Sequence, residues 1–200
     1  MRWIARLFAV LLLLVIVGAI WAVVGVTRRG ISARDQPTAV EVSLAGGLRR
    51  LAIPAHQRNL RNPAPADDAA LKEGMEHFAD HCALCHGNDG KGSMMGRNMY
   101  PKAPDMTSAG TQSLTDGEIF YIIKNGVRLT GMPAWGGEGH GEQDDWHLVQ
   151  FIRHLPKITP EELHAMEELN PKSKHDMNEE EDENRFLSGD EGHESPEHHH

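Results

Sequence analysis

Cys82-Ala83-Leu84-Cys85-His86-Gly87 contains the only two cysteines among the 200 residues of the chain. The pattern C-x-x-C-H is typical of the covalent attachment of a c-type haem. Two thiols three positions apart at the end of a helix can add across the two vinyl groups of one haem. The histidine that follows can then reach the iron from the same side. The motif therefore predicts one haem c, attached to Cys82 and Cys85 with His86 as the proximal ligand.

Three other interpretations of the motif explain it less well. A thioredoxin-like C-x-x-C requires a βαβ context and gains nothing from the histidine that follows. A structural zinc site requires two further Cys or His ligands at suitable spacing. A disulfide between the two cysteines would close a very small loop and stabilise the fold little.

Charge divides the chain into three parts. Residues 1–66 carry nine Arg or Lys and two acids, residues 67–157 eight and thirteen, and residues 158–200 three and fourteen. This distribution indicates a basic segment near a membrane, a mildly acidic globular middle and a strongly acidic tail. No part of the pattern indicates binding to nucleic acid.

The N-terminal part, residues 1–28, is predicted to be a transmembrane anchor. Leu7 to Val26 contains no charged residue and, at 1.5 Å per residue, is long enough to cross a hydrocarbon core of about 30 Å. A cleaved signal peptide is the alternative, with Val17-Gly18-Ala19 as the small-residue cleavage site. The apolar sequence continues past that site, which favours a retained anchor.

Residues 29–66 are predicted to be a basic linker, because prolines, a glycine pair and arginines interrupt any sustained period. A short helix is possible near Val40–Leu51. The basic character suits anionic lipid headgroups or an acidic partner subunit. A solvated tether explains the composition equally well.

Residues 67–157 form the predicted helical domain. A helix capped by Asp67 or Asp68 leads to the cysteines, a second begins at the capping box of Thr115 and Glu118, and a third covers about Gln143–Leu155. The last helix is expected to pack against the first. The histidines of these helices (His77, His81, His147 and His154) are expected on exposed faces.

Two loops of this domain contain candidate haem contacts. Gly87–Gly110 is too long and irregular to be held by its own hydrogen bonds, so a haem face is expected to hold it. Within it, Pro104 is a candidate to offer its carbonyl to the second ring nitrogen of His86. In the second loop, Met132 lies between Gly131 and Pro133 and is the preferred second axial ligand, since thioether sulfur binds haem iron.

Other residues compete with these candidates or accompany them. Four methionines of the first loop are competitors for the iron: Met94, Met95, Met99 and Met106. Trp135 is expected near the haem edge with its N–H satisfied, for instance by a propionate.

Residues 158–200 are predicted to contain a short helix and a disordered tail. Thr159 and Pro160 start the helix, which ends near Leu169. The segment beyond is acidic and has almost no apolar residues. His198–His200 are interpreted as a purification tag remnant or a truncated native tail, with a weak metal site that includes His175 and His193 as a further alternative.

The chain resembles the class I c-type cytochromes of the small bacterial monohaem kind. The features that carry the resemblance are Cys82–His86, Pro104, the helix after Thr115 and the segment Gly131–Trp135. The resemblance covers about residues 67–157. It implies an all-α fold of three to four helices around one covalently bound haem, with thioether bonds at Cys82 and Cys85 and axial ligation by His86 and Met132. It also implies that the haem domain lies outside the cytoplasm.

The expected function is that of a single-electron carrier, or the cytochrome subunit of a membrane oxidoreductase, on the periplasmic face of a bacterial inner membrane. Its partners would be redox proteins; catalysis on a small-molecule substrate is not expected, because both axial positions are filled. A haem-based gas sensor or enzyme with a labile distal ligand is one alternative. A metal-binding module that acts through the His- and acid-rich tail is another.

Overall fold

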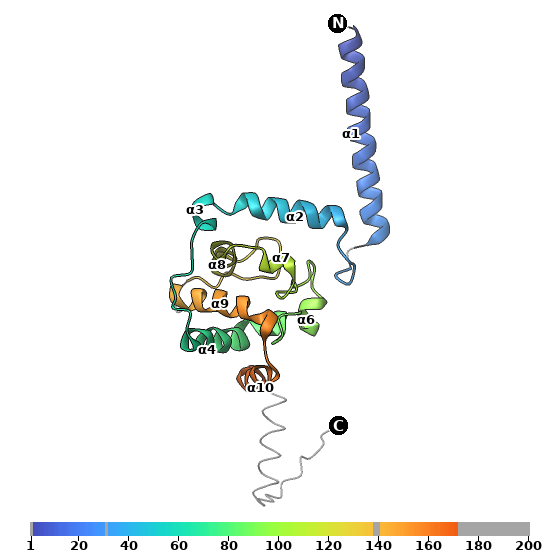
Figure 1. The fold of residues 1–200 in the computed structure, drawn as a ribbon. Coiled ribbons are helices and arrows are strands. Elements are labelled where there is room, and N and C mark those ends of the chain that lie inside the picture. The colour runs from blue at the N-terminus through green and yellow to red at the C-terminus, as the bar shows by residue number, and fades with distance from the viewer. Residues whose placement is uncertain (1, 31, 138–140, 172–200) are drawn as a thin grey trace, which may run out of the picture.

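The computed structural model describes residues 2–30, 32–137 and 141–171, and this part of the chain is helical and contains no β-strand (Figure 1). The tail expected to be disordered, with its histidines, lies outside the described residues. The helices, in chain order, are α1 (Arg2–Arg29), α2 (Ala39–Ala52), α3 (Ala55–Arg58), α4 (Asp68–His77), the π-helical turn η1 (Phe78–Cys82), α5 (Ala83–His86), α6 (Met94–Arg97), α7 (Ala109–Gln112), α8 (Asp116–Asn125), α9 (Glu142–His154), the 3-10 turn η2 (Leu155–Lys157) and α10 (Pro160–Leu169).

The predicted helix starts are confirmed. The Asp67 carboxylate accepts a hydrogen bond of 2.9 Å from the Ala70 N–H and caps α4. Thr115 and Glu118 form the predicted capping box of α8, and Thr159 forms a second one at α10. Each cap satisfies backbone donors that the first turn of a helix leaves unpaired. The sequence therefore specifies these boundaries locally.

The core lies where α4 crosses α9, as the sequence predicted. The two helices approach closely at Gly74, where a side chain would collide with the His147 backbone. Below this crossing the Phe78 and Phe151 rings pack with centroids 5.2 Å apart. Both phenylalanines are fully buried, and burial of one such side chain stabilises the fold by about 1.5–3 kcal/mol.

Helix α8 packs on α9 with its own aromatic contact. The Phe120 ring stacks on the Trp146 indole at 4.0 Å with an interplanar angle of 10°. α9 is therefore covered by α4 and by α8, which leaves little of its surface to solvent. This cover explains why His147 is only 2% exposed. His154 pairs with Glu162 at 2.9 Å. The expectation that both histidines lie on exposed faces is therefore wrong.

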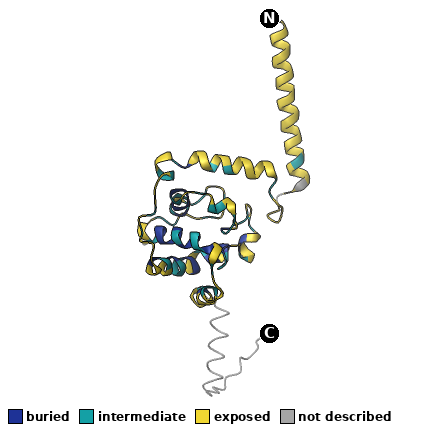
Figure 2. Cartoon of the chain, in the orientation of Figure 1, coloured by how far each residue is buried: buried dark blue, intermediate teal, exposed yellow. Residues whose placement is uncertain are grey.

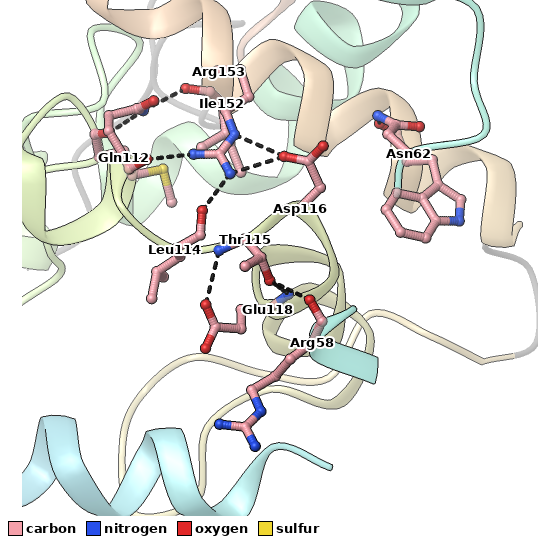
Figure 3. Close-up of polar contacts among 11 residues, drawn as sticks. Arg58, Asn62, Gln112, Leu114, Thr115, Asp116, Glu118, Ile152 and Arg153 are labelled. Carbon is pink, nitrogen blue, oxygen red and sulfur yellow. Dashed lines mark hydrogen bonds and ion pairs between the residues drawn. The ribbon is translucent and has the colours of Figure 1, made fainter. Parts of the chain in front are cut away.

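Arg153 joins the end of α9 to the turn between α7 and α8, as Figure 3 shows. Its guanidinium donates to Asp116 Oδ1 at 2.9 Å, to the Gln112 carbonyl at 2.8 Å and to the Leu114 carbonyl. The Gln112 amide in turn donates to the Ile152 carbonyl at 2.9 Å. One side chain thus satisfies backbone acceptors that a short helix leaves unpaired.

The basic linker is not a solvated tether along its whole length. The predicted short helix is present as α2, and the chain after it follows the surface of the domain. Ile53 is 3% exposed, and the Arg58 carbonyl accepts a 2.7 Å bond from the Thr115 hydroxyl (Figure 3). The Asn62 amide donates to the Trp146 carbonyl at 2.8 Å. Residues 53–62 are therefore part of the packed structure.

Helix α1 extends away from the rest of the chain (Figure 1) and is exposed along its length (Figure 2). It is long and apolar enough, over Arg2–Arg28, to cross a membrane. A signal sequence near the N-terminus has the same length and composition, so these two properties do not distinguish a retained anchor from a cleaved signal peptide.

Candidate haem site

The attachment motif follows a local change in helix geometry. At the end of α4 the chain adopts the π-helical turn η1, in which the Ala83 N–H bonds to the Phe78 carbonyl five residues earlier. Phe78 and Ala79 anchor this turn in the core with no exposed surface. π-Turns inserted in α-helices are frequent at functional sites. Here the turn joins α4 to α5, so that Cys82 ends the turn and Cys85 follows in α5.

The two cysteines are free thiols, and both are half-buried. Burial, aided by the negative charges of Cys85 and Asp145, raises the pKa of the Cys82 thiol to about 12. A redox-active or nucleophilic C-x-x-C requires a lowered thiol pKa. The environment of Cys82 therefore argues against the thioredoxin-like interpretation.

His86 ends α5 with its side chain inside the domain, 6% exposed. Burial lowers the pKa of the imidazole, and the Pro104 backbone opposes this shift as a hydrogen-bond acceptor. The Nδ1 atom is fully buried and makes no hydrogen bond of ordinary geometry. Pro104 thus lies next to the His86 ring, where the sequence expected it, and the neutral imidazole that ligates a metal is favoured.

The loop after the motif holds itself in place, contrary to expectation. The Gly92 N–H donates to the His86 carbonyl at 2.7 Å, and the Met106 N–H to the Gly90 carbonyl at 2.8 Å. Two short helices, α6 and α7, also lie in this segment. Its internal hydrogen bonds satisfy the backbone without a haem face, so the expectation that the loop lacks its own bonds is wrong.

This loop brings two of the competing methionines close to the site. Met95 Sδ lies 4.0 Å from Cys85 Sγ, and the Met99 methyl group touches Gly131, where any Cβ would collide with it. Met106, by contrast, is 8% exposed and belongs to the hydrophobic core, as a gap-filling methionine does.

Met132 lies in a loop fixed at both ends. Its carbonyl accepts from the Val127 N–H at 3.2 Å, and its N–H donates to the Thr130 hydroxyl at 3.1 Å. The Trp135 N–H bonds to the Ile123 carbonyl at 3.1 Å at the end of α8. Met132 itself is half-buried. The loop is therefore held by α8, and its sulfur is not absorbed into the core.

Trp135 connects this loop to the attachment motif. Its indole meets the His81 imidazole edge-on, with ring centroids 5.1 Å apart, and His81 directly precedes Cys82. The structure thus places the Gly131–Trp135 segment beside the end of the helix that carries the cysteines. The contact between Trp135 and His81 brings these two segments together. The contact of Trp135 with a haem propionate stays a prediction.

The residues present fit a covalently attached haem. Two free thiols and a buried imidazole with an unsatisfied nitrogen lie within one turn and a half of helix. A backbone acceptor stands beside the imidazole, and thioether sulfurs lie in the two neighbouring loops. This donor set suits haem iron, for which His and Met are common axial ligands. The part of the chain that the structure describes contains no cluster of three or more His, Cys, Asp or Glu ligands.

Sequence reasoning missed the buried polar group at the α4–α9 crossing. His147 Nδ1 lies 2.8 Å from the Glu73 carboxylate, and the Asp145 side chain is 1% exposed. Positions 145 to 149 are all partly or fully buried, so no single apolar face marks α9. Only the knowledge that two helices cover α9 could have indicated these residues.

This fold and site define a c-type cytochrome domain. Residues 69–152 match the family model described as cytochrome c oxidase, cbb3-type, subunit III, so this part of the chain is similar to that family.

Two curated relatives have names that agree with the family. The chain is 39% identical over 88 residues to "Cbb3-type cytochrome c oxidase subunit FixP" of Azorhizobium caulinodans, covering 40% of this chain and 25% of the relative. It is 33% identical over 85 residues to "Cbb3-type cytochrome c oxidase subunit CcoP" of Rhodobacter capsulatus, covering 38% and 24%. The chain thus spans about a quarter of the length of these relatives.

Proposed function

We propose that this protein is a membrane-anchored single-electron carrier that holds one haem c in residues 67–157, between a basic linker and an acidic tail. Cys82 and Cys85 would hold the cofactor by thioether bonds, and His86 and Met132 would supply the nitrogen and sulfur ligands of its iron. The buried His86, next to two free thiols in a domain of the cytochrome family, is the observation that carries the proposal. When bound, the haem supplies a one-electron redox couple.

The chain's own residues position that couple. The Pro104 carbonyl would accept a hydrogen bond from His86 Nδ1 once the haem is bound, which would fix the ring and leave the other nitrogen for the iron. Trp135 packs against His81 at the entrance to the motif. With both axial positions filled by side chains, no position is left for a small-molecule substrate, so the chain transfers electrons without catalysis of its own.

The setting of the proposed carrier is the periplasmic face of a bacterial inner membrane. The apolar helix α1 and the kinship of the domain with cbb3-type oxidase subunits support a membrane location. Redox proteins dock transiently on such carriers through small interfaces, and a shared membrane raises their effective concentration. A role as the cytochrome subunit of a membrane oxidoreductase follows the same logic.

The ligand set can be tested by absorption spectroscopy of the full chain with its haem attached. Met132→Ala should lose the weak far-red band of a ferric His–Met haem and gain carbon monoxide binding. Met99→Ala is the matched control, because Met99 touches the neighbouring Gly131, and it should keep the band.

Two results would contradict the proposal. Loss of the band in Met99→Ala but not in Met132→Ala would move the distal ligand to the first loop. A wild-type protein that is high-spin and binds carbon monoxide would replace the carrier with a gas sensor or enzyme.

A further inference from the structure

Helix α2 exposes a row of large apolar side chains, although it lies against the domain. Val40, Leu44, Leu48 and Leu51 are 67%, 61%, 66% and 83% exposed. At 100° per residue these four positions fall within about 80° of the helix circumference. We refer to these four residues as the apolar stripe of α2.

The opposite side of α2 faces the domain. Gly46, Arg49 and Ile53 line a shallow cleft together with Leu114 and Glu118, which belong to α8 and the turn before it. These α2 positions lie about 170° around the helix from the centre of the apolar stripe. The stripe therefore points away from the domain, and Figure 2 shows α2 as an exposed helix along the edge of the molecule.

The rotation of α2 about its axis is fixed by polar contacts. The Thr38 hydroxyl and the Glu41 carboxylate form a capping box at its first turn. The same carboxylate accepts a 3.1 Å bond from the Tyr100 hydroxyl of the loop before the α7 helix. At the other end Ile53 is buried. The stripe cannot turn inward without the loss of these contacts.

The position of α2 along the chain indicates what covers the stripe. Residues 30–38 are the only link between the end of α1 and the start of α2, and nine residues reach at most about 30 Å. In Figure 1 α2 runs across the direction of α1, on the side of the domain from which the chain leaves for α1. If α1 crosses a membrane, α2 lies at its surface.

Charge supports a lipid surface. Arg28 and Arg34 are exposed near the start of α2, and Arg50, which borders the same cleft as Arg49, is exposed in the last turn of α2. Helices that lie in a membrane interface combine an apolar face with basic residues, and the basic residues attract anionic headgroups. A soluble partner would not explain why the stripe lies so near the end of the apolar helix.

We propose that α2 is an interfacial membrane helix whose apolar stripe inserts into the bilayer that α1 crosses. The domain then hangs from the membrane on the opposite side of α2, in one fixed orientation, rather than moving freely at the end of a tether. This inference rests on the membrane location of α1 and is independent of the haem ligands.

The test places a photocrosslinker on either side of α2 in the full chain. Leu44→p-benzoylphenylalanine carries the probe on the stripe. Val42→p-benzoylphenylalanine is the matched control, because Val42 is 56% exposed but points toward the domain side. Each variant is reconstituted in vesicles of phosphatidylcholine and phosphatidylglycerol, irradiated, and analysed by mass spectrometry for lipid adducts.

The probe at position 44 should form lipid adducts in roughly tenfold higher yield than the probe at position 42, since a helix diameter of about 10 Å separates the two sides. A probe at Leu48 should repeat the result of position 44. Equal yields at positions 42 and 44 would overturn the proposal, as would adducts between two copies of the chain at position 44. The readout measures lipid contact of α2, and the haem ligands are read separately from the absorption spectrum of the same variants, so failure of this inference is distinct from failure of the proposed function.

Discussion

Gly74 offers the sharpest test of the helix crossing on which the domain is built. A Cβ added at Gly74 would lie 2.7 Å from the His147 carbonyl carbon and closer still to its oxygen, whereas ordinary contact begins at 3.4 Å. The obstacle is backbone, so Gly74→Ala forces α9 away from α4 by about 0.7 Å or more. Overpacking of this kind costs roughly 1–3 kcal/mol, offset by about 0.5–1 kcal/mol from the better helix propensity of alanine.

The assay is thermal unfolding of the full chain with its haem, followed by circular dichroism. A cost of 1 kcal/mol lowers the midpoint of a 60–100-residue domain by about 4–8 °C, so a mid-range net cost of about 1–1.5 kcal/mol should lower the Gly74→Ala midpoint by roughly 4–12 °C. Gly110→Ala is the control, because its Cβ would meet only the Ser108 hydroxyl at 3.5 Å, and its midpoint should stay the same or rise slightly. A Gly74→Ala midpoint equal to that of Gly110→Ala would refute the close crossing of α4 and α9.

Three further predictions concern polar contacts of the same domain. Glu73→Ala should destabilise the fold by about 0.5–1 kcal/mol in chemical denaturation, since the buried His147 Nδ1 loses the carboxylate at 2.8 Å, although the pair lacks hydrogen-bond geometry, and an unchanged free energy of unfolding would argue against that pair. Arg153→Met should cost about 1–3 kcal/mol in the same assay, because it leaves the Gln112 and Leu114 carbonyls without their donor; Lys157→Met at the exposed end of η2 serves as control. Burial raises the pKa of Glu162, but hydrogen bonds from the Thr159 backbone and His154 outweigh it, so the net pKa is lowered. A lowered pKa gives stability that is complete above the ordinary value of 4.5 and is lost as the pH falls through the lower folded value. The protection factors of the α10 amides, which are corrected for the intrinsic pH dependence of hydrogen exchange, should therefore fall below that pH in wild type and be independent of pH in this range in Glu162→Gln.

The features that sequence predicted well are those whose cause is local. Asp67, Thr115 and Thr159 each satisfy backbone donors a few residues away, so their effect on helix starts does not depend on the rest of the fold. The attachment motif is also local, because the spacing of Cys82, Cys85 and His86 alone matches one haem, and the attachment of haem to these residues stays a prediction. Such features are readable before any packing is known.

The features that sequence predicted poorly depend on contacts between distant segments. The burial of His147 results from the cover of α9 on two sides, which a search for one apolar face does not detect. The loop after the motif was expected to need a haem to hold it, yet the bond from Met106 to Gly90 and its neighbours satisfy the backbone. Glycines and methionines in a sequence do not show which backbone groups they will meet.

The choice among methionines shows where sequence and structure complement each other. The flanking Gly131 and Pro133 favour Met132 by sequence, because a methionine in such a loop has little core to fill. The structure removes Met106 from the competition by burying it and adds weight to Met95 and Met99 by placing them against Cys85 and Gly131. Sequence and structure together thus identify the methionines to compare. The variants Met99→Ala and Met132→Ala test which of these two methionines binds the iron.

The N-terminal extension changes how the domain relates to its membrane. Composition alone described residues 29–66 as a basic linker, and a flexible linker would let the haem domain sample many orientations. The structure instead binds Arg58 to Thr115 and Asn62 to Trp146, so α2 is fixed to the domain while its apolar stripe faces outward. A stripe fixed on one side of a domain can hold that domain at a membrane only in one orientation, and that orientation determines which face of the cytochrome remains open to its redox partners.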